Sequence, residues 1–93
     1  MEDERDIIME QLFSSRGRIR VIKTIFKLGE ANISKIARIT GLHHRLVEKY
    51  LIQLKDYGIV EEHRYGRLRL FKLNYTNPKT YLIRELLEAF EES

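Results

Sequence analysis

The sequence predicts a mainly α-helical domain with a small β-hairpin, arranged as a winged helix-turn-helix with extra N- and C-terminal helices. Three observations lead to this prediction. Apolar residues recur at helical spacing through most of the chain and change to a strand pattern in residues 59–73. Two short helical segments flank Gly41, as in a helix-turn-helix. The basic residues are concentrated between two acidic ends.

Length and composition limit the chain to one small domain. Its 93 residues provide one modest core. There is no cysteine, which excludes disulfides, thiolate metal sites and cysteine catalysis. No apolar run is long enough to span a membrane, and the charged opening MEDERDIIME is unlike a secretory signal. We therefore expect a single cytoplasmic domain over residues 1–93 that needs no cofactor.

The charges are distributed unevenly along the chain. Residues 1–13 hold five acids and one base, a net charge of −4, and residues 76–93 hold four acids and two bases, a net charge of −2. Residues 14–75 hold fourteen bases and five acids, a net charge of +9. A basic centre of this size favours a polyanion as partner over a merely solvated surface.

The first predicted element is a short helix over residues 4–13, within the N-terminal segment 1–13. Ile8 and Leu12 share one of its faces and Phe13 lies on another, which is helical spacing. The acidic residues around them fit an element that lies away from a polyanion.

A second helix is predicted over residues 16–28. Ser14 or Ser15 is a suitable N-cap, because a serine hydroxyl accepts a hydrogen bond from the first helical turn. Gly29 follows in the place of a C-cap glycine. Residues 31–33 then form a short extended link.

The predicted helix-turn-helix spans residues 34–57. Ser34 is the expected N-cap of a helix over residues 35–40. Gly41 breaks that helix where the turn needs a permissive backbone, and a second helix covers residues 44–57. The apolar residues expected to pack the two helices together are Ile36, Ala37, Leu42, Val47, Leu51 and Leu54.

The wing is predicted over residues 59–73. IVEEHR and RLRLFKL have the composition of two strands, and the glycine of the intervening YG, Gly66, suits a tight turn with positive φ. Asn77 followed by Pro78 is a strong start signal for the last helix, over residues 78–92.

Residues 14–74 resemble winged-helix transcription regulators of the ArsR and MarR kind, particularly the small archaeal ones. The resemblance rests on the RIRVI opening, the ISKIA and GL pattern of the first motif helix, the YGIVE ending of the second and the YGR of the wing. It implies a homodimer that binds double-stranded DNA and regulates transcription. The chain departs from the family where its recognition helix opens on His43, His44 and Arg45 in place of Ser, Thr or Asn.

In such a fold the second motif helix enters the major groove and its exposed N-terminal face reads bases. Arg45 can bond guanine in a bidentate manner, and Glu48 either accepts from cytosine or orients a neighbouring side chain. The predicted base-reading residues are His44, Arg45, Glu48 and Lys49. The predicted backbone contacts are Arg16, Arg18, Ser34, Lys35, Arg38, His43 and Lys55. The predicted wing contacts, in the adjacent minor groove or on the backbone, are Arg64, Tyr65, Gly66, Arg67 and Arg69.

The terminal helices carry more apolar residues than one small domain buries easily. We expect them to pair across a two-fold axis, giving a homodimer on a roughly palindromic site. The predicted dimerisation residues are Ile8, Leu12, Phe13, Ile83, Leu86, Leu87 and Phe90. Whether the N-terminal helix, the C-terminal helix or both make the interface stays open, and nothing marks a site for a small-molecule effector.

Other functions have less support. The sequence has no phosphate loop, no serine–histidine–acid arrangement and no evident pair of carboxylates, so we do not expect an enzyme. A metal site drawing on His43, His44, Glu48 and His63 is disfavoured, because adjacent histidines on a helix diverge by about 100° and zinc needs three or four ligands. RNA binding is also less favoured, because the sequence lacks the exposed pair of aromatic residues on which RNA bases usually stack. The main alternative is a winged helix used for protein contact in a transcription or assembly complex.

Overall fold

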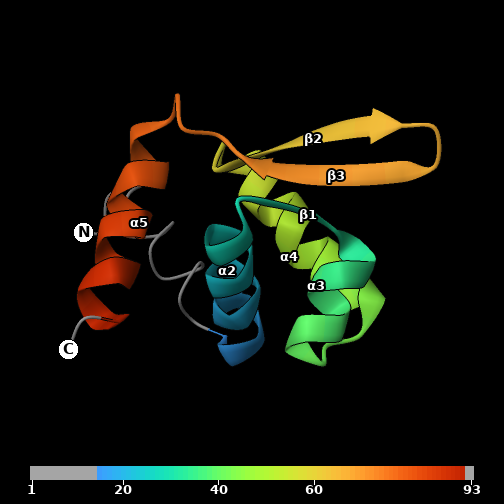
Figure 1. Cartoon of the computed structure of the whole chain (residues 1–93), viewed down its shortest axis with the longest axis horizontal. Coiled ribbons are helices and arrows are strands. Elements are labelled where there is room, and N and C mark those ends of the chain that lie inside the picture. Colours follow the sequence, from blue (N-terminus) through green and yellow to red (C-terminus); the bar gives the residue numbers. More distant parts are fainter. Residues whose placement is uncertain (1–14, 92–93) are drawn as a thin grey trace, which may run out of the picture.

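The computed structural model describes residues 15–91 of the chain (Figure 1). Its elements are α2 (Arg16–Leu28), β1 (Glu30–Asn32), α3 (Ile33–Thr40), α4 (His44–Asp56), β2 (Val60–Tyr65), β3 (Leu68–Leu73) and α5 (Pro78–Glu91). Their order confirms the predicted winged helix-turn-helix. The predicted helix over residues 4–13 lies outside the described residues, and so do Ile8, Leu12 and Phe13.

The ends of α2 follow the predicted local signals. Ser15 is the N-cap, and its hydroxyl accepts a hydrogen bond from the backbone N–H of Arg18 at 3.3 Å. Gly29 ends the helix with a φ of 83°, in the left-handed region that side chains with a Cβ avoid. Its N–H donates to the carbonyl of Ile25, so the last turn is closed before the chain enters β1.

The N-cap of α3 differs from the prediction. The helix begins at Ile33, and Asn32 caps it through a side-chain oxygen that accepts from the backbone N–H of Lys35 at 2.8 Å. Ser34 is an exposed residue of the first turn, so its assignment as the cap is wrong. Asparagine and serine cap helices about equally well. Asn32 takes the position because it ends β1, where its extended backbone already suits a cap.

Three antiparallel strands form one sheet in the order β1-β3-β2, and β2 with β3 forms the wing. Tyr65 pairs with Leu68, so the loop between the strands is only Gly66 and Arg67. Gly66 has a φ of 60°, and within residues 15–91 only glycines have a positive φ. Positive φ at the first loop residue alone is the pattern of a type II′ turn. Tyr65, which the sequence pattern places in the turn, is the last residue of β2.

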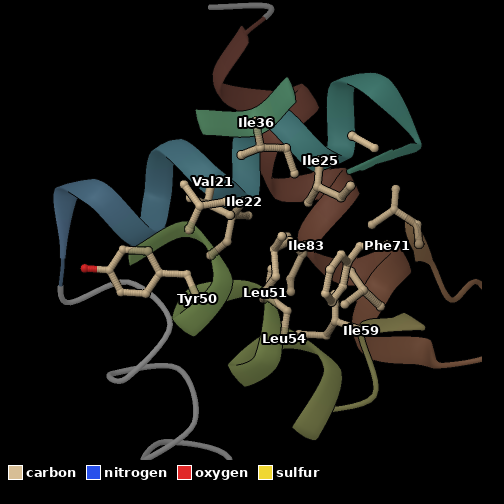
Figure 2. Packing of buried hydrophobic residues seen from close by; sticks show 14 of the residues in the cluster. Val21, Ile22, Ile25, Ile36, Tyr50, Leu51, Leu54, Ile59, Phe71 and Ile83 are labelled. Atoms are coloured by element: carbon tan, nitrogen blue, oxygen red, sulfur yellow. The ribbon is translucent and has the colours of Figure 1, made fainter. Parts of the chain in front are cut away.

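The core lies where α2, α3 and α4 meet each other and the sheet (Figure 2). Its fully buried apolar side chains are Val21, Ile22, Ile25, Ile36, Val47, Leu51, Leu54, Ile59, Val60 and Phe71. Burying one such side chain stabilises the fold by roughly 1.5–3 kcal/mol. Ala37 is also buried, as expected for the small residue of the helix-turn-helix. This packing fixes the inner face of α4 and therefore decides which of its residues face solvent.

α5 begins where predicted, directly after the cap Asn77. The side-chain oxygen of Asn77 accepts from the backbone N–H of Lys79 at 3.0 Å. Its amide donates to the carbonyl of Tyr57, at the end of α4, at 3.1 Å. Thr80 is fully buried and its hydroxyl donates to the carbonyl of Ile59. The start of α5 is therefore joined to the end of α4 by specific polar contacts.

α5 has two apolar faces. Ile83 packs into the core of its own chain and Leu87 is half-buried against it. Leu82, Leu86 and Phe90 are exposed by 64%, 37% and 74%. An apolar cleft of about 290 Å³ between α2 and α5 is lined by Ile19, Lys23, Leu86, Leu87, Phe90 and Glu91. Ile83, which the sequence analysis assigns to the dimer, is thus a core residue here, whereas Leu86 and Phe90 lie at the surface.

Candidate nucleic-acid interface

Gly41 and His43 form the turn that starts the recognition helix. Gly41 has a φ of 75°, and its N–H donates to the carbonyl of Ala37 at 2.9 Å. His43 is the N-cap of α4, and its Nδ1 accepts from the backbone N–H of Arg45 at 3.1 Å. An imidazole nitrogen accepts a hydrogen bond only when it carries no proton. Capping therefore accounts for the Nδ1 of His43, and its assignment as a DNA backbone contact stays a prediction.

The outer face of α4 carries the predicted base-reading residues. The buried residues of this helix are Val47, Tyr50, Leu51 and Leu54. Because these four face the core, His44, Arg45 and Lys49 are exposed on the other side. Glu48 is only partly exposed, since its carboxylate bonds to Arg69 of the wing. The first turn of the helix therefore presents cationic and imidazole groups to solvent.

A cleft of about 320 Å³ separates the wing from the starts of α3 and α4. Its lining residues are Asn32, Ile33, Ser34, His44, Arg45, Glu48, Arg67, Leu68 and Arg69. Arg45 enters from the recognition helix and Arg67 from the wing tip, and both are exposed. The cleft thus brings together predicted site residues from three separate parts of the sequence.

Three of the cations that the sequence predicts as backbone contacts are exposed: Arg16, Lys35 and Arg38. Arg16 starts α2, whereas Lys35 and Arg38 belong to α3, the first helix of the motif. The hairpin tip and α3 lie at one end of the molecule and α5 at the other (Figure 1). Exposed cations can neutralise phosphates, and the assignment of these residues as backbone contacts stays a prediction.

Arg18 and Lys55 already have partners inside the protein. The Nε of Arg18 donates to Gln53 at 2.9 Å, and its guanidinium lies 5.0 Å from the ring centroid of Tyr50. Lys55 forms an ion pair with Glu62 at 3.2 Å. A DNA phosphate would have to compete with these contacts, so the predicted backbone role of both residues stays a prediction. In the structure they attach α4 to α2 and to the wing.

Glu62 is the centre of the charge network on the wing, although sequence reasoning did not single it out. Its carboxylate accepts from Lys55 at 3.2 Å, from Arg64 at 3.0 Å and from Arg69 at 2.8 Å. The side chain is only 3% exposed. The pKa of Glu62 is lowered from 4.5 to about 2, chiefly by the bond from Arg69; burial acts the other way, and Lys55 and Arg64 add to the lowering. Glu62 therefore stays ionised at neutral pH.

Arg69 connects the wing to the recognition helix. Its Nε donates to Glu62 on the neighbouring strand, and its other arm donates to Glu48 on α4. Glu62 first, and then Glu48, raise the pKa of Arg69 above its ordinary value. The guanidinium also lies 5.6 Å from the ring centroid of Phe71, in the core. Arg69 therefore lies on the inner face of the wing, the face that also carries the buried Phe71 and Leu73, and its assignment to DNA stays a prediction.

The candidate metal ligands do not converge. Within residues 15–91, no group of three or more histidine, aspartate or glutamate side chains could hold a metal ion. His63 lies on the outer face of the wing, where its Nε2 is 3.1 Å from a carboxylate oxygen of Glu61. His44 and Glu48 line the cleft, which His63 does not reach.

Solved structures share this arrangement. The AntR antimony-specific transcriptional repressor is similar with a TM-score of 0.76 at 18% identity, over 95% of this chain and 78% of its own. The transcriptional repressor PagR of Bacillus anthracis has a TM-score of 0.69 at 23% identity, over 90% and 93%. An ArsR-family transcriptional regulator has a TM-score of 0.66 at 20% identity, over 96% and 93%. The chain has the winged helix-turn-helix fold.

Comparisons by sequence add no closer relative. No protein-family model matches the chain, and no curated protein matches it. Among the helices described, none is both long and apolar enough to cross a membrane. The likeness to these transcription repressors and regulators therefore rests on three-dimensional structure alone.

Proposed function

We propose that this protein is a sequence-specific, double-stranded DNA-binding transcription regulator. In this proposal α4 lies in the major groove and the wing tip contacts the adjacent minor groove or backbone. The observation that carries it is the cleft in which Arg45 of the recognition helix and Arg67 of the wing tip lie on two different elements and both face solvent. The net charge of +9 over residues 14–75 supports a polyanionic partner. The fold relatives are transcription repressors and regulators by name, not enzymes.

The proposed roles follow from exposure. Arg45 and His44 read base edges, and Arg45 is best suited to guanine because its guanidinium can donate two parallel hydrogen bonds. Arg67 contacts the minor groove or its phosphates. The backbone N–H groups at the start of α4 favour a phosphate beside them. Because Glu48 is bonded to Arg69, it could read a base only by giving up that partner.

We also propose a homodimer formed through α5. The exposed stripe of Leu82, Leu86 and Phe90 is larger than the isolated apolar residues common on monomers. It lies at the end of the molecule opposite the wing (Figure 1), so pairing through it leaves both recognition helices open to DNA. A two-fold dimer would read a roughly palindromic site. The archaeal origin suggested by the resemblance stays a proposal.

The test is selection of bound sequences from a random duplex pool, followed by affinity measurements on a selected and a random duplex. Arg45→Ala should weaken binding to the selected duplex by about 1–3 kcal/mol and relax one base position. Lys72→Ala is the control, because Lys72 is an exposed base on the outer face of the wing. Six phosphate contacts would give a slope of about −5 in log K against log salt.

Each outcome separates the candidate functions. Equal weakening of Arg45→Ala on both duplexes would assign Arg45 to a phosphate instead of a base. The absence of salt-dependent binding to any duplex by the unmodified protein would overturn the proposed function and favour the protein-contact alternative.

A further inference from the structure

The recognition helix holds the wing at two points. Glu48, in the second turn of α4, bonds to Arg69 of β3, and Lys55, in its last turn, bonds to Glu62 of β2. Glu48 and Lys55 are seven residues apart, so they lie on nearly the same face of the helix, about 10 Å from each other. Two attachments at this separation resist rotation of the hairpin over the helix better than either one alone.

The register of the wing explains why Glu62 is needed. Arg64 lies directly opposite Arg69, and two like charges in that position repel each other. Glu62 is displaced by two residues along β2, on the same face, and accepts a hydrogen bond from each of the two arginines. One buried carboxylate thus offsets the repulsion of two cations. It joins both strands of the wing to α4 through Lys55.

We propose that Glu62, Arg69 and Glu48 are positioning residues that set the angle between the wing and the recognition helix. That angle decides whether Arg67 reaches its groove while Arg45 occupies the neighbouring one. Glu48 then serves the wing through Arg69 and is not a base reader. The inference rests on the proposed DNA-binding function, since it assigns a role within that same interface.

The test is a double-mutant cycle between the buried carboxylate and the wing tip. Affinities for the selected duplex are measured by fluorescence anisotropy for the unmodified protein, Glu62→Gln, Arg67→Ala and the double variant. We expect Arg67→Ala to weaken binding about tenfold in the unmodified protein and less than about twofold in the Glu62→Gln background. A misplaced wing gains little from Arg67, so its loss costs little.

Glu61→Gln is the matched control. Glu61 neighbours Glu62 on β2, but its side chain is 50% exposed and pairs only with His63 among the interactions described. In this background Arg67→Ala should keep its full tenfold effect. If Glu62 affected DNA binding through its charge alone, Glu62→Gln would bind the duplex more tightly than the unmodified protein, and so would Glu61→Gln. Removing a negative charge near DNA strengthens phosphate contact. Tighter binding by Glu62→Gln, like that by Glu61→Gln, would therefore overturn the inference.

Arg69→Lys tests whether a single side chain must bond to Glu62 and Glu48 at the same time. A lysine keeps one positive charge near Glu62 but lacks the planar fork that reaches two carboxylates at once. We expect this variant to reduce the Arg67→Ala effect as Glu62→Gln does. Glu48→Gln should do so too, without a change of preference at any single base pair. A change confined to one base pair would return Glu48 to base reading.

Hydrogen exchange of the wing amides gives a readout independent of DNA. Faster exchange of β2 and β3 amides in Glu62→Gln, with the core amides of α2 unchanged, is the expected result. Full additivity of the cycle with unchanged wing exchange would overturn the inference. If the unmodified protein binds no duplex, the proposed function fails, and the exchange measurement still decides whether these residues hold the wing.

Discussion

Glu62 occupies an inward position of β2 that strand alternation would normally give to an apolar residue. Val60, two residues earlier on the same face, is buried in that way. A carboxylate is tolerated there because three cationic donors surround it. Removing the carboxylate leaves those cations without their shared partner, so the residue contributes to stability as well as to the shape of the wing.

The pKa of Glu62 leads to a prediction about acid stability. Its value in the folded protein, about 2, lies below the ordinary 4.5, so the stabilisation is complete above about pH 4.5 and is lost as pH falls towards 2. At 1.36 kcal/mol per pH unit this amounts to roughly 3 kcal/mol. Glu62→Gln should therefore lower the free energy of unfolding at pH 7 and approach the unmodified protein near pH 2.

Urea unfolding at pH 7, 4.5 and 2.5 measures the difference between the two proteins. Glu61→Gln, at an exposed position of the same strand, should show a much smaller difference at every pH. A Glu62→Gln difference that stays constant across this range would show that packing of the side chain, and not its charge, is what matters.

Single residues that act locally could be predicted from the sequence. Ser15 and Asn77 cap helices, and Gly29 ends one, because each acts within a turn of its own position. Ser34 shows the limit of this reasoning. Asn32 and Ser34 are equally suitable caps, and only the end of β1, which depends on pairing with β3, decides between them.

At the scale of elements, the wing depends on a single glycine. A Cβ at Gly66 would meet no atom within 4 Å, so an alanine there has room. Its φ of 60° is nevertheless unfavourable for any residue with a Cβ. Gly66→Ala should therefore destabilise the protein by about 1–2 kcal/mol through backbone conformation alone.

Gly66→Asn is the matched comparison, because asparagine tolerates positive φ better than alanine does. Chemical denaturation should rank the glycine protein first, the asparagine variant second and the alanine variant third. Equal stability of the three proteins would mean that the turn relaxes to another type without cost.

The hairpin and the helices were predictable as elements, but their contacts were not. Periodicity finds strands over IVEEHR and RLRLFKL, yet it cannot show that β1 joins β3. The candidate site divides in the same way. Arg45 and Arg67 were predictable as exposed cations of a helix start and a hairpin tip. The bonds of Arg69 to Glu48 and Glu62 were not, because they need the register of the wing against α4.

At the scale of the whole molecule, the proposed dimer leads to a further prediction. Leu82 is 64% exposed on the outer face of α5, so a charge there costs little in one chain but is unfavourable in an apolar interface. Sedimentation at micromolar concentration should show a dimer for the unmodified protein and a monomer for Leu82→Glu. Duplex affinity should fall with the loss of the dimer.

Ile39→Glu is the control for this substitution. Ile39 is 53% exposed on α3, far from α5, and the same change there should leave the dimer intact. A monomeric unmodified protein at micromolar concentration would contradict the dimer, and a dimeric Leu82→Glu would place the interface elsewhere.

The double role of Asn77 has a mechanical consequence. The side chain of Asn77 caps α5 and also donates to the carbonyl of Tyr57, the residue that follows α4. The end of α4 and the start of α5 are therefore held together at one short joint. In a dimer built on α5, the distance between the two recognition helices is set by the geometry of this joint. Lengthening the connection at residues 74–77 would then change the spacing of half-sites that the pair can span, without altering any residue that touches a base.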